Sequence, residues 1–172
     1  MKYLSPLILS LVAVSAFAAS QPTALLPLPQ KMELRQGAFS LQPATRILTD
    51  RPSQSSARFL AERLRQGTGY KFNLVSSTQP VVTPGAVMLT TNNAKPALGP
   101  EGYELTVAPD SVVIRATSQA GMFYGVQTLL QLLSPEIFAA KPATVGGWTI
   151  PCVAIEDQPR FQWRGFMFDV SR

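Results

Sequence analysis

Histidine is absent from the 172 residues of the chain, and cysteine occurs once, as Cys152. Without an imidazole, these residues supply no Ser-His-Asp or Cys-His mechanism, no HExxH zinc site and no other histidine-based metal site. A single thiol cannot form an intramolecular disulfide, and Cys152 lies in the apolar run 151–155 with no base nearby in the sequence. We therefore expect no metal, no cofactor, and a Cys152 that is a small buried hydrophobic side chain.

Charge is also sparse, at 15% of the residues, while 46% are hydrophobic, which is typical of a globular chain and not of a disordered one. The net charge is +5, a sign that can indicate a nucleic-acid partner. However, the basic residues are scattered, with no run of three and no interleaved aromatic residues of the kind that stack on bases. We therefore expect a solvated basic surface and no nucleic-acid partner.

The first 19 residues have the three parts of a secretory signal peptide. Lys2 gives the positively charged start, residues 4–14 the apolar stretch, and Ala16 and Ala18 an A-x-A cleavage site. The apolar stretch is short for a membrane span, so we expect cleavage and no stable membrane span afterwards. An uncleaved N-terminal anchor is the alternative. The signal peptide predicts that the mature protein is periplasmic or secreted.

Strand and helix patterns alternate through residues 20–150, separated by turns that draw on the chain's 15 prolines and 11 glycines. Strands are predicted at 37–41, 46–49, 71–76, 86–91, 103–107 and 112–116, and helices at 53–66 and 119–133. This order indicates an α+β fold, a mixed sheet with two helices packed on one face. The proline- and glycine-containing stretch 135–150 is predicted to be a linker.

Three glycines have predicted local roles in the helices. Gly67 is the expected C-terminal stop of the first helix. Gly121 and Gly125 stand four residues apart in the second helix, where they would let it approach the sheet closely. Such a pair favours tight packing over a binding role.

A different pattern begins at residue 151. Residues 153–155 are predicted to form a strand, 157–159 a turn, and 161–170 a nearly continuous apolar strand. An apolar strand without alternation is typical of a parallel sheet that is covered on both faces. Such a strand needs parallel neighbours and covering helices from further along the chain.

Polar side chains gather at the end of this last strand, at Asp169, Ser171 and Arg172. In α/β barrels, residues at the C-terminal ends of strands face the active site. An aspartate beside an arginine can fix the guanidinium for a polar substrate there. A surface ion pair at a frayed end accounts for the same residues equally well, so the pattern alone leaves both interpretations open.

Two groups of motifs carry a resemblance to a known family. The first is Pro-Arg-Phe-Gln-Trp-Arg-Gly at 159–165 with Asp-Val-Ser-Arg at 169–172. The second comprises Leu-Pro-Leu-Pro-Gln at 26–30, Glu-Gly-Tyr-Glu-Leu at 101–105 and Ala-Gly-Met-Phe-Tyr-Gly-Val-Gln-Thr-Leu at 120–129. The chain resembles glycoside hydrolase family 20, the β-N-acetylhexosaminidases, which include chitobiases. The first group resembles the entry to that family's catalytic barrel, and the second resembles its non-catalytic N-terminal domain.

The resemblance implies a domain plan. Residues 20–150 would be the non-catalytic α+β domain, and residues 151–172 the start of a catalytic (β/α)8 TIM barrel. Such a barrel needs roughly 200 residues or more. The chain is therefore expected to be an N-terminal part of the enzyme, to contain only the first barrel strand, and to be inactive alone.

The resemblance also implies roles for single residues. Arg172 matches the arginine that hydrogen-bonds hydroxyls of the terminal sugar, Asp169 is expected to orient it, and Arg164 matches an arginine that looks structural. No catalytic residue is expected here, because the family's Asp-Glu pair lies further along the chain. Glu156 and Asp157 are adjacent, but they are expected in a solvated turn.

The implied reaction is hydrolysis of terminal N-acetylhexosamine residues by substrate-assisted retaining catalysis, in which the sugar's own N-acetyl carbonyl attacks the anomeric carbon. The implied partner is an N-acetylglucosamine-containing oligosaccharide or glycan. Two alternatives are a free-standing accessory or scaffold domain and a carbohydrate-binding domain without catalysis. The exposed apolar residues 166–168 argue against the first. The absence of a row of aromatic residues on one predicted strand face argues against the second.

Overall fold

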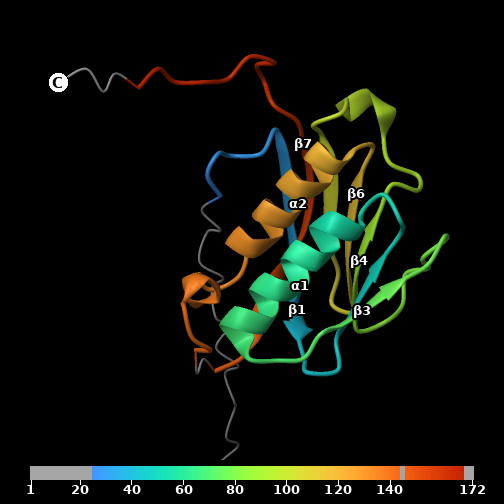
Figure 1. Cartoon of the computed structure of the whole chain (residues 1–172), viewed down its shortest axis with the longest axis vertical. Coiled ribbons are helices and arrows are strands. Elements are labelled where there is room, and N and C mark those ends of the chain that lie inside the picture. The colour runs from blue at the N-terminus through green and yellow to red at the C-terminus, as the bar shows by residue number, and fades with distance from the viewer. Residues whose placement is uncertain (1–24, 144–145, 169–172) are drawn as a thin grey trace, which may run out of the picture.

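Seven strands of the chain hydrogen-bond side by side in one mixed sheet, in the order β1-β7-β5-β6-β4-β2-β3. The computed structural model describes residues 25–143 and 146–168 (Figure 1). The strands are β1 (Lys31–Leu41), β2 (Arg46–Thr49), β3 (Asn73–Ser76), β4 (Ala86–Thr90), β5 (Tyr103–Val107), β6 (Ser111–Ala116) and β7 (Trp148–Asp157). The helices are α1 (Gln54–Thr68), α2 (Gln119–Gln131) and the short 3₁₀ helices η1 (Pro96–Leu98) and η2 (Pro135–Phe138). The predicted signal peptide, Asp169 and Arg172 lie outside the described residues.

Strand direction divides the sheet into two halves. β2 pairs in parallel with β3 and β4, and β4 pairs in parallel with β6. β5 and β6 form the predicted antiparallel hairpin, and β7 pairs antiparallel with both β5 and β1. β4 is buried over its whole length, as expected for an apolar strand in the parallel half of a sheet.

The two helices lie side by side on one face of the sheet (Figure 1). Their inward residues recur at helical spacing, so that Leu60 and Leu64 of α1 and Met122 and Val126 of α2 are at most 1% exposed. They share one core with the inward residues of the strands, among them Leu105. The predicted α+β class, a mixed sheet with two helices on one face, is confirmed.

The two glycines of α2 allow the close approach that their spacing predicts. A Cβ atom at Gly121 would lie 2.2 Å from the carbonyl oxygen of Gly102. A Cβ atom at Gly125 would lie 2.6 Å from Cγ2 of Ile114. Any larger residue would therefore push α2 away from the sheet.

The end of α1 lies two residues beyond the predicted one. Gly69, with a φ of 75°, caps the helix, and its backbone N–H donates to the carbonyl of Arg65 at 2.9 Å. Gly67 instead lies inside the helix, where a Cβ would be 2.6 Å from the carbonyl oxygen of Ile137. The prediction of a stop at Gly67 is wrong because this glycine allows contact with η2. Since Ile137 is fully buried, the predicted linker 135–150 is in part a packed element.

β7 extends across the predicted change of domain at residue 151. It lies between β1 and β5 in the sheet, and its register pairs Val153 with Val107 and Ile155 with Leu105. Val153 and Ile155 are at most 2% exposed. The first seven residues assigned to the barrel therefore complete the core of the sheet domain.

Residues 158–168 then leave the sheet beyond β7 without forming a strand (Figure 1). The strand predicted at 161–170 is thus not formed over 161–168, and its last two residues lie outside the described part. Phe166, Met167 and Phe168 are 88%, 95% and 74% exposed. The physical reason is that such a strand needs neighbours on both sides, and the described residues supply none.

Candidate functional site

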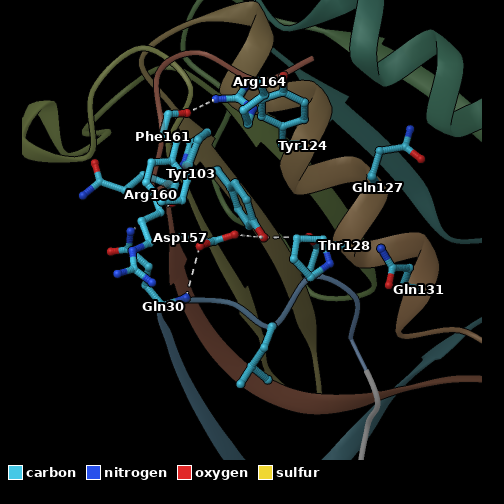
Figure 2. A pocket seen from close by; sticks show the side chains of 14 residues that line it. Gln30, Tyr103, Tyr124, Gln127, Thr128, Gln131, Asp157, Arg160, Phe161 and Arg164 are labelled. Carbon is cyan, nitrogen blue, oxygen red and sulfur yellow. Dashed lines mark hydrogen bonds between the residues drawn. The ribbon is translucent and has the colours of Figure 1, made fainter. Parts of the chain in front are cut away.

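A cleft of ≈ 740 Å³ lies where four parts of the chain meet (Figure 2). Residues 27–30, the start of β5, helix α2 and residues 157–164 contribute its walls. Its lining includes aromatic rings, amide side chains, one carboxylate and two guanidinium groups. This mixture is typical of sites that bind polar ligands, so the partners of each polar group decide what the cleft can do.

Asp157, the last residue of β7, hydrogen-bonds to two other residues in one wall of the cleft (Figure 2). Its Oδ1 accepts a hydrogen bond from the backbone N–H of Gln30 at 3.1 Å, and its Oδ2 accepts from the Tyr103 hydroxyl at 3.4 Å. That hydroxyl also lies 2.6 Å from Oγ1 of Thr128 on α2. Burial raises the pKa of Tyr103, and the nearby Asp157 charge adds to the shift against the opposing Thr128 bond. The phenol therefore stays protonated and ties β5 to α2 and β7.

The amides of the cleft also bind other parts of the chain. The side chain of Gln131 accepts from the backbone N–H of Leu26 at 3.0 Å and donates to its carbonyl at 3.1 Å. Gln30 Nε2 donates to the carbonyl of Gln158 at 3.0 Å. Much of the cleft's polar surface is thus already engaged. The cleft is therefore the place where residues 26–30 and residues 158–168 are hydrogen-bonded to each other and to helix α2.

Arg164 attaches residues 158–168 to the sheet domain beside the cleft. Its Nη2 and Nη1 donate to the two carboxylate oxygens of Glu101 at 2.5 and 3.3 Å. Nη2 also donates to the Tyr124 hydroxyl of α2 at 3.4 Å, and this hydroxyl donates to Glu101 at 3.2 Å. The hydrogen bond with Arg164 lowers the pKa of Glu101, so the carboxylate stays ionised. We call these three residues the Glu101–Tyr124–Arg164 clamp.

The clamp shows what Arg164 contacts within the described residues, and its implied role in bracing the first barrel strand stays a prediction. Sequence reasoning did not identify Glu101 or Tyr124 as its partners, although both lie in stretches that carry the resemblance. They are 63 and 40 residues away from Arg164, and only the fold brings them together. A local signal is the charge of Glu101 two residues before the half-buried strand β5.

Glu156 and Asp157 are not in a solvated turn, which corrects the prediction, but are the last two residues of β7. Successive side chains of a strand point to opposite faces, so the two carboxylates cannot work as a pair. Glu156 forms ion pairs with Lys95 and Lys31. The hydrogen bond from Lys95, followed by that from Lys31, lowers the pKa of Glu156.

A glycosidase needs a carboxylic acid whose pKa is raised, so that it can protonate the leaving oxygen. Four carboxyl groups have pKa values displaced in the opposite direction, namely Asp50, Glu101, Glu136 and Glu156. Each is held as an anion by hydrogen bonds within the described residues. None of these four is poised as a proton donor.

The thiol of Cys152 is 1% exposed on β7. Burial raises its pKa, so that the reactive thiolate is disfavoured. The prediction of a small buried hydrophobic side chain is confirmed.

Neither a metal site nor a membrane-spanning helix is found in the described ranges 25–143 and 146–168. They contain no group of three or more His, Cys, Asp or Glu residues placed to hold a metal ion. They also contain no helix that is both long and apolar enough to cross a membrane.

Comparison with known proteins identifies the family. The family model described as glycosyl hydrolase family 20, domain 2, matches residues 22–158. The chain belongs to glycosyl hydrolase family 20. The match covers the whole sheet and both helices and ends one residue after β7, before the residues that Arg164 attaches. The family predicted from the motifs is therefore confirmed.

Two curated relatives share about a third of their residues with the chain where they align. A beta-hexosaminidase of Porphyromonas gingivalis is 33% identical over 149 residues, which cover 86% of this chain and 19% of the relative. A beta-N-acetylhexosaminidase of Cellulomonas fimi is 33% identical over 151 residues, covering 87% of this chain and 29% of the relative. The chain thus spans less than a third of the length of these relatives.

Solved family 20 structures have the same fold in the matched part. A mutant beta-hexosaminidase of Streptomyces plicatus in complex with product (GlcNAc) superposes with a TM-score of 0.73 at 33% identity, covering 84% of this chain and 28% of that chain. The beta-N-acetylhexosaminidase of Streptomyces coelicolor A3(2) gives a TM-score of 0.69 at 32% identity, covering 79% and 26%. Identity above 30% at these scores supports common ancestry as well as a common fold.

Proposed function

We propose that this chain supplies the supporting domain of an exported β-N-acetylhexosaminidase, which hydrolyses terminal non-reducing N-acetylhexosamine residues of glycans. The observation that carries the proposal is the family 20 match over residues 22–158, the part that forms the sheet and its two helices. Relatives named as β-hexosaminidases support the activity. The substrate is an N-acetylglucosamine-containing oligosaccharide or glycan.

In the proposed mechanism, the N-acetyl carbonyl of the substrate attacks its own anomeric carbon, and an acidic residue protonates the leaving oxygen. The acid and the residue that orients the N-acetyl group belong to a TIM barrel that begins after β7. Arg172 would donate hydrogen bonds to hydroxyls of the terminal sugar, and Asp169 would hold its guanidinium. The lowered pKa values of Glu101 and Glu156 support placing the proton donor outside the sheet domain.

Export is the second part of the proposal. Residues 1–19 would direct the chain across the inner membrane and be removed after the A-x-A site, which places the mature enzyme in the periplasm or outside the cell. Mass spectrometry of the N-terminus of the mature protein tests this. An N-terminus that still begins at Met1 would contradict it.

A carbohydrate-binding domain without catalysis is the alternative. The rings of Tyr124 and Phe161 beside the amides of the cleft favour it, because aromatic faces and amides are suited to sugar rings and hydroxyls. Against it, the side chains of Gln30 and Gln131 already bind the chain itself. Titration of the 172-residue chain with N-acetylglucosamine oligomers separates the two: the proposed supporting domain should not bind them.

The activity is tested with a pair of aryl glycosides on the complete gene product. Release of the chromophore from an aryl N-acetylglucosaminide, but not from the matching aryl glucoside, is expected because only the first carries the attacking carbonyl. Equal turnover of both glycosides would contradict the substrate-assisted mechanism. Turnover of neither would contradict the proposed activity.

A further inference from the structure

Residues 158–168, which follow β7, are called the outgoing segment here. The Glu101–Tyr124–Arg164 clamp is the main polar attachment between this segment and the sheet domain. Within the described residues, the side-chain hydrogen bonds from residues 161–168 to the domain all come from Arg164. The large apolar side chains there are mostly exposed, among them Trp163 at 92%. Apart from the Gln30–Gln158 hydrogen bond at its start, the polar attachment of residues 158–168 to the domain therefore comes from one guanidinium group.

The geometry of the clamp fixes an orientation and not merely a distance. The guanidinium of Arg164 meets both oxygens of Glu101, which constrains its plane as well as its position. Tyr124 binds both partners from α2, so the clamp is anchored to a helix as well as to the loop before β5. Nη1 of Arg164 also donates to the carbonyl of Phe161 at 2.6 Å. This last bond lies within the segment, and it couples the orientation of the guanidinium to the backbone at Phe161.

The distance to the proposed sugar-binding residue makes this orientation important. Arg172 follows Arg164 by eight residues, which span at most about 26–29 Å when extended. A change in the direction of the chain at Arg164 therefore affects where the residues that follow it can reach. Misplacement of a binding group by even about 1 Å is costly to an active site.

We propose that Glu101 and Tyr124 are positioning residues, which hold Arg164 and thereby set the direction of the chain that leads to the proposed sugar-binding residue, Arg172. This inference rests on the proposed function for the role of Arg172. It gives the supporting domain a part in substrate binding through one ion pair, although the domain touches no substrate.

The first test measures KM and kcat of the complete enzyme with an aryl N-acetylglucosaminide. Glu101→Gln should raise KM roughly three- to tenfold with kcat within about twofold, because Arg172 binds the sugar in the ground state and the transition state alike. The exchange of partners in Glu101→Arg/Arg164→Glu should restore most of the lost affinity. Glu33→Gln is the matched control, since it breaks the exposed Glu33–Arg35 pair at the sheet edge and should leave KM unchanged.

Two results of this test would overturn the proposal. One is a wild-type KM in Glu101→Gln. The other is a fall in kcat at unchanged KM, which is what mere loss of folded enzyme produces, with no rescue by the exchange of partners.

The second test does not depend on glycosidase activity and uses trypsin on the 172-residue chain. Cleavage after Arg164 requires its side chain to leave Glu101, so Glu101→Gln should speed that cleavage roughly three- to fivefold relative to Glu33→Gln. Equal rates would overturn the proposal. If the complete protein hydrolyses no N-acetylhexosaminide and cleavage is still accelerated, the proposed function fails while the clamp stands.

Discussion

Among single residues, Asp50 shows how one buried carboxylate joins three elements. It is 2% exposed and accepts hydrogen bonds from the backbone N–H of Ser53 at 2.9 Å, the Thr90 hydroxyl at 2.9 Å and the backbone N–H of Thr91 at 2.5 Å. These bonds connect the C-terminal ends of β2 and β4 to the start of α1. Burial opposes ionisation of Asp50, but the hydrogen bonds from Ser53 and Thr91 outweigh it and lower its pKa.

Asp50→Asn should therefore reduce stability in a pH-dependent way. A carboxyl with a lowered folded-state pKa adds stability above its unfolded pKa of about 3.9, and this is lost as the pH falls through the folded value. At neutral pH, the free energy of unfolding should drop by about 2–4 kcal/mol, because the amide NH₂ would face hydrogen-bond donors. The difference from the wild type should shrink in acid. Urea unfolding at neutral pH and near pH 3 measures both effects, and a variant as stable as the wild type at neutral pH would contradict them.

Gly121→Ala tests the contact between α2 and the sheet. Alanine would add about 1 kcal/mol of helix propensity, but its Cβ would lie 2.2 Å from the backbone carbonyl of Gly102. Because a backbone atom cannot move aside cheaply, we expect a net loss of about 1–2 kcal/mol. The control is Gly146→Ala, where no atom lies within 4 Å of the added Cβ and the change should stay within about 0.5 kcal/mol. A Gly121→Ala variant that is more stable than the wild type would refute this packing.

Roles set by neighbouring residues in the sequence were predictable, and roles set by distant partners were not. The spacing of Gly121 and Gly125 and the apolar surroundings of Cys152 are local patterns, and both predictions hold. Gly67 was assigned to the wrong role because its reason, the carbonyl of Ile137, belongs to another element. Glu101 was not identified because an ion pair with Arg164 leaves no local pattern.

At the scale of elements, β7 is the strand whose bounds the sequence predicted least well. The β5–β6 hairpin was predicted to within one residue at each end, since alternation and its turn are local signals. The start of β7 was assigned to the linker because the prolines and glycines of residues 135–147 precede it directly. Pro151 pairs with Ala38 beside a register irregularity of β1, in which Gly37 has a φ of 96°. A bulge of this kind accommodates a residue that lacks a backbone N–H.

The position of β7 between β1 and β5 predicts where the domain can be cut. A chain of residues 20–158 should unfold cooperatively in urea, because it keeps all seven strands. A chain of residues 20–150 should lose cooperative unfolding, because it lacks Val153 and Ile155 from the core and leaves the first half of β1, residues 31–34, without its partners. Circular dichroism of the two chains measures this. Equal cooperativity would place the end of the domain at 150, as first predicted.

At the scale of the whole molecule, the described residues divide into a packed domain and an uncovered outgoing segment. The domain has a continuous core between the sheet and helices, whereas the segment exposes Trp163, Phe166 and Phe168. Several large exposed apolar side chains close together along a chain are typical of a surface that another part of a protein covers. We propose that the catalytic barrel covers them in the complete enzyme. The sequence predicted the family and the α+β class of the domain. It could not predict whether residues 161–170 form a strand, because such a strand depends on neighbouring strands that the described residues do not supply.

The central claim is that the chain supports an N-acetylhexosaminidase whose proton donor lies outside the sheet domain. The direct measurement is chromophore release from an aryl N-acetylglucosaminide by the 172-residue chain, beside the complete gene product at equal molar concentration. We predict turnover by the complete gene product and none above background by the 172-residue chain. Turnover by the 172-residue chain would contradict the claim, since it would place a working acid within the chain itself.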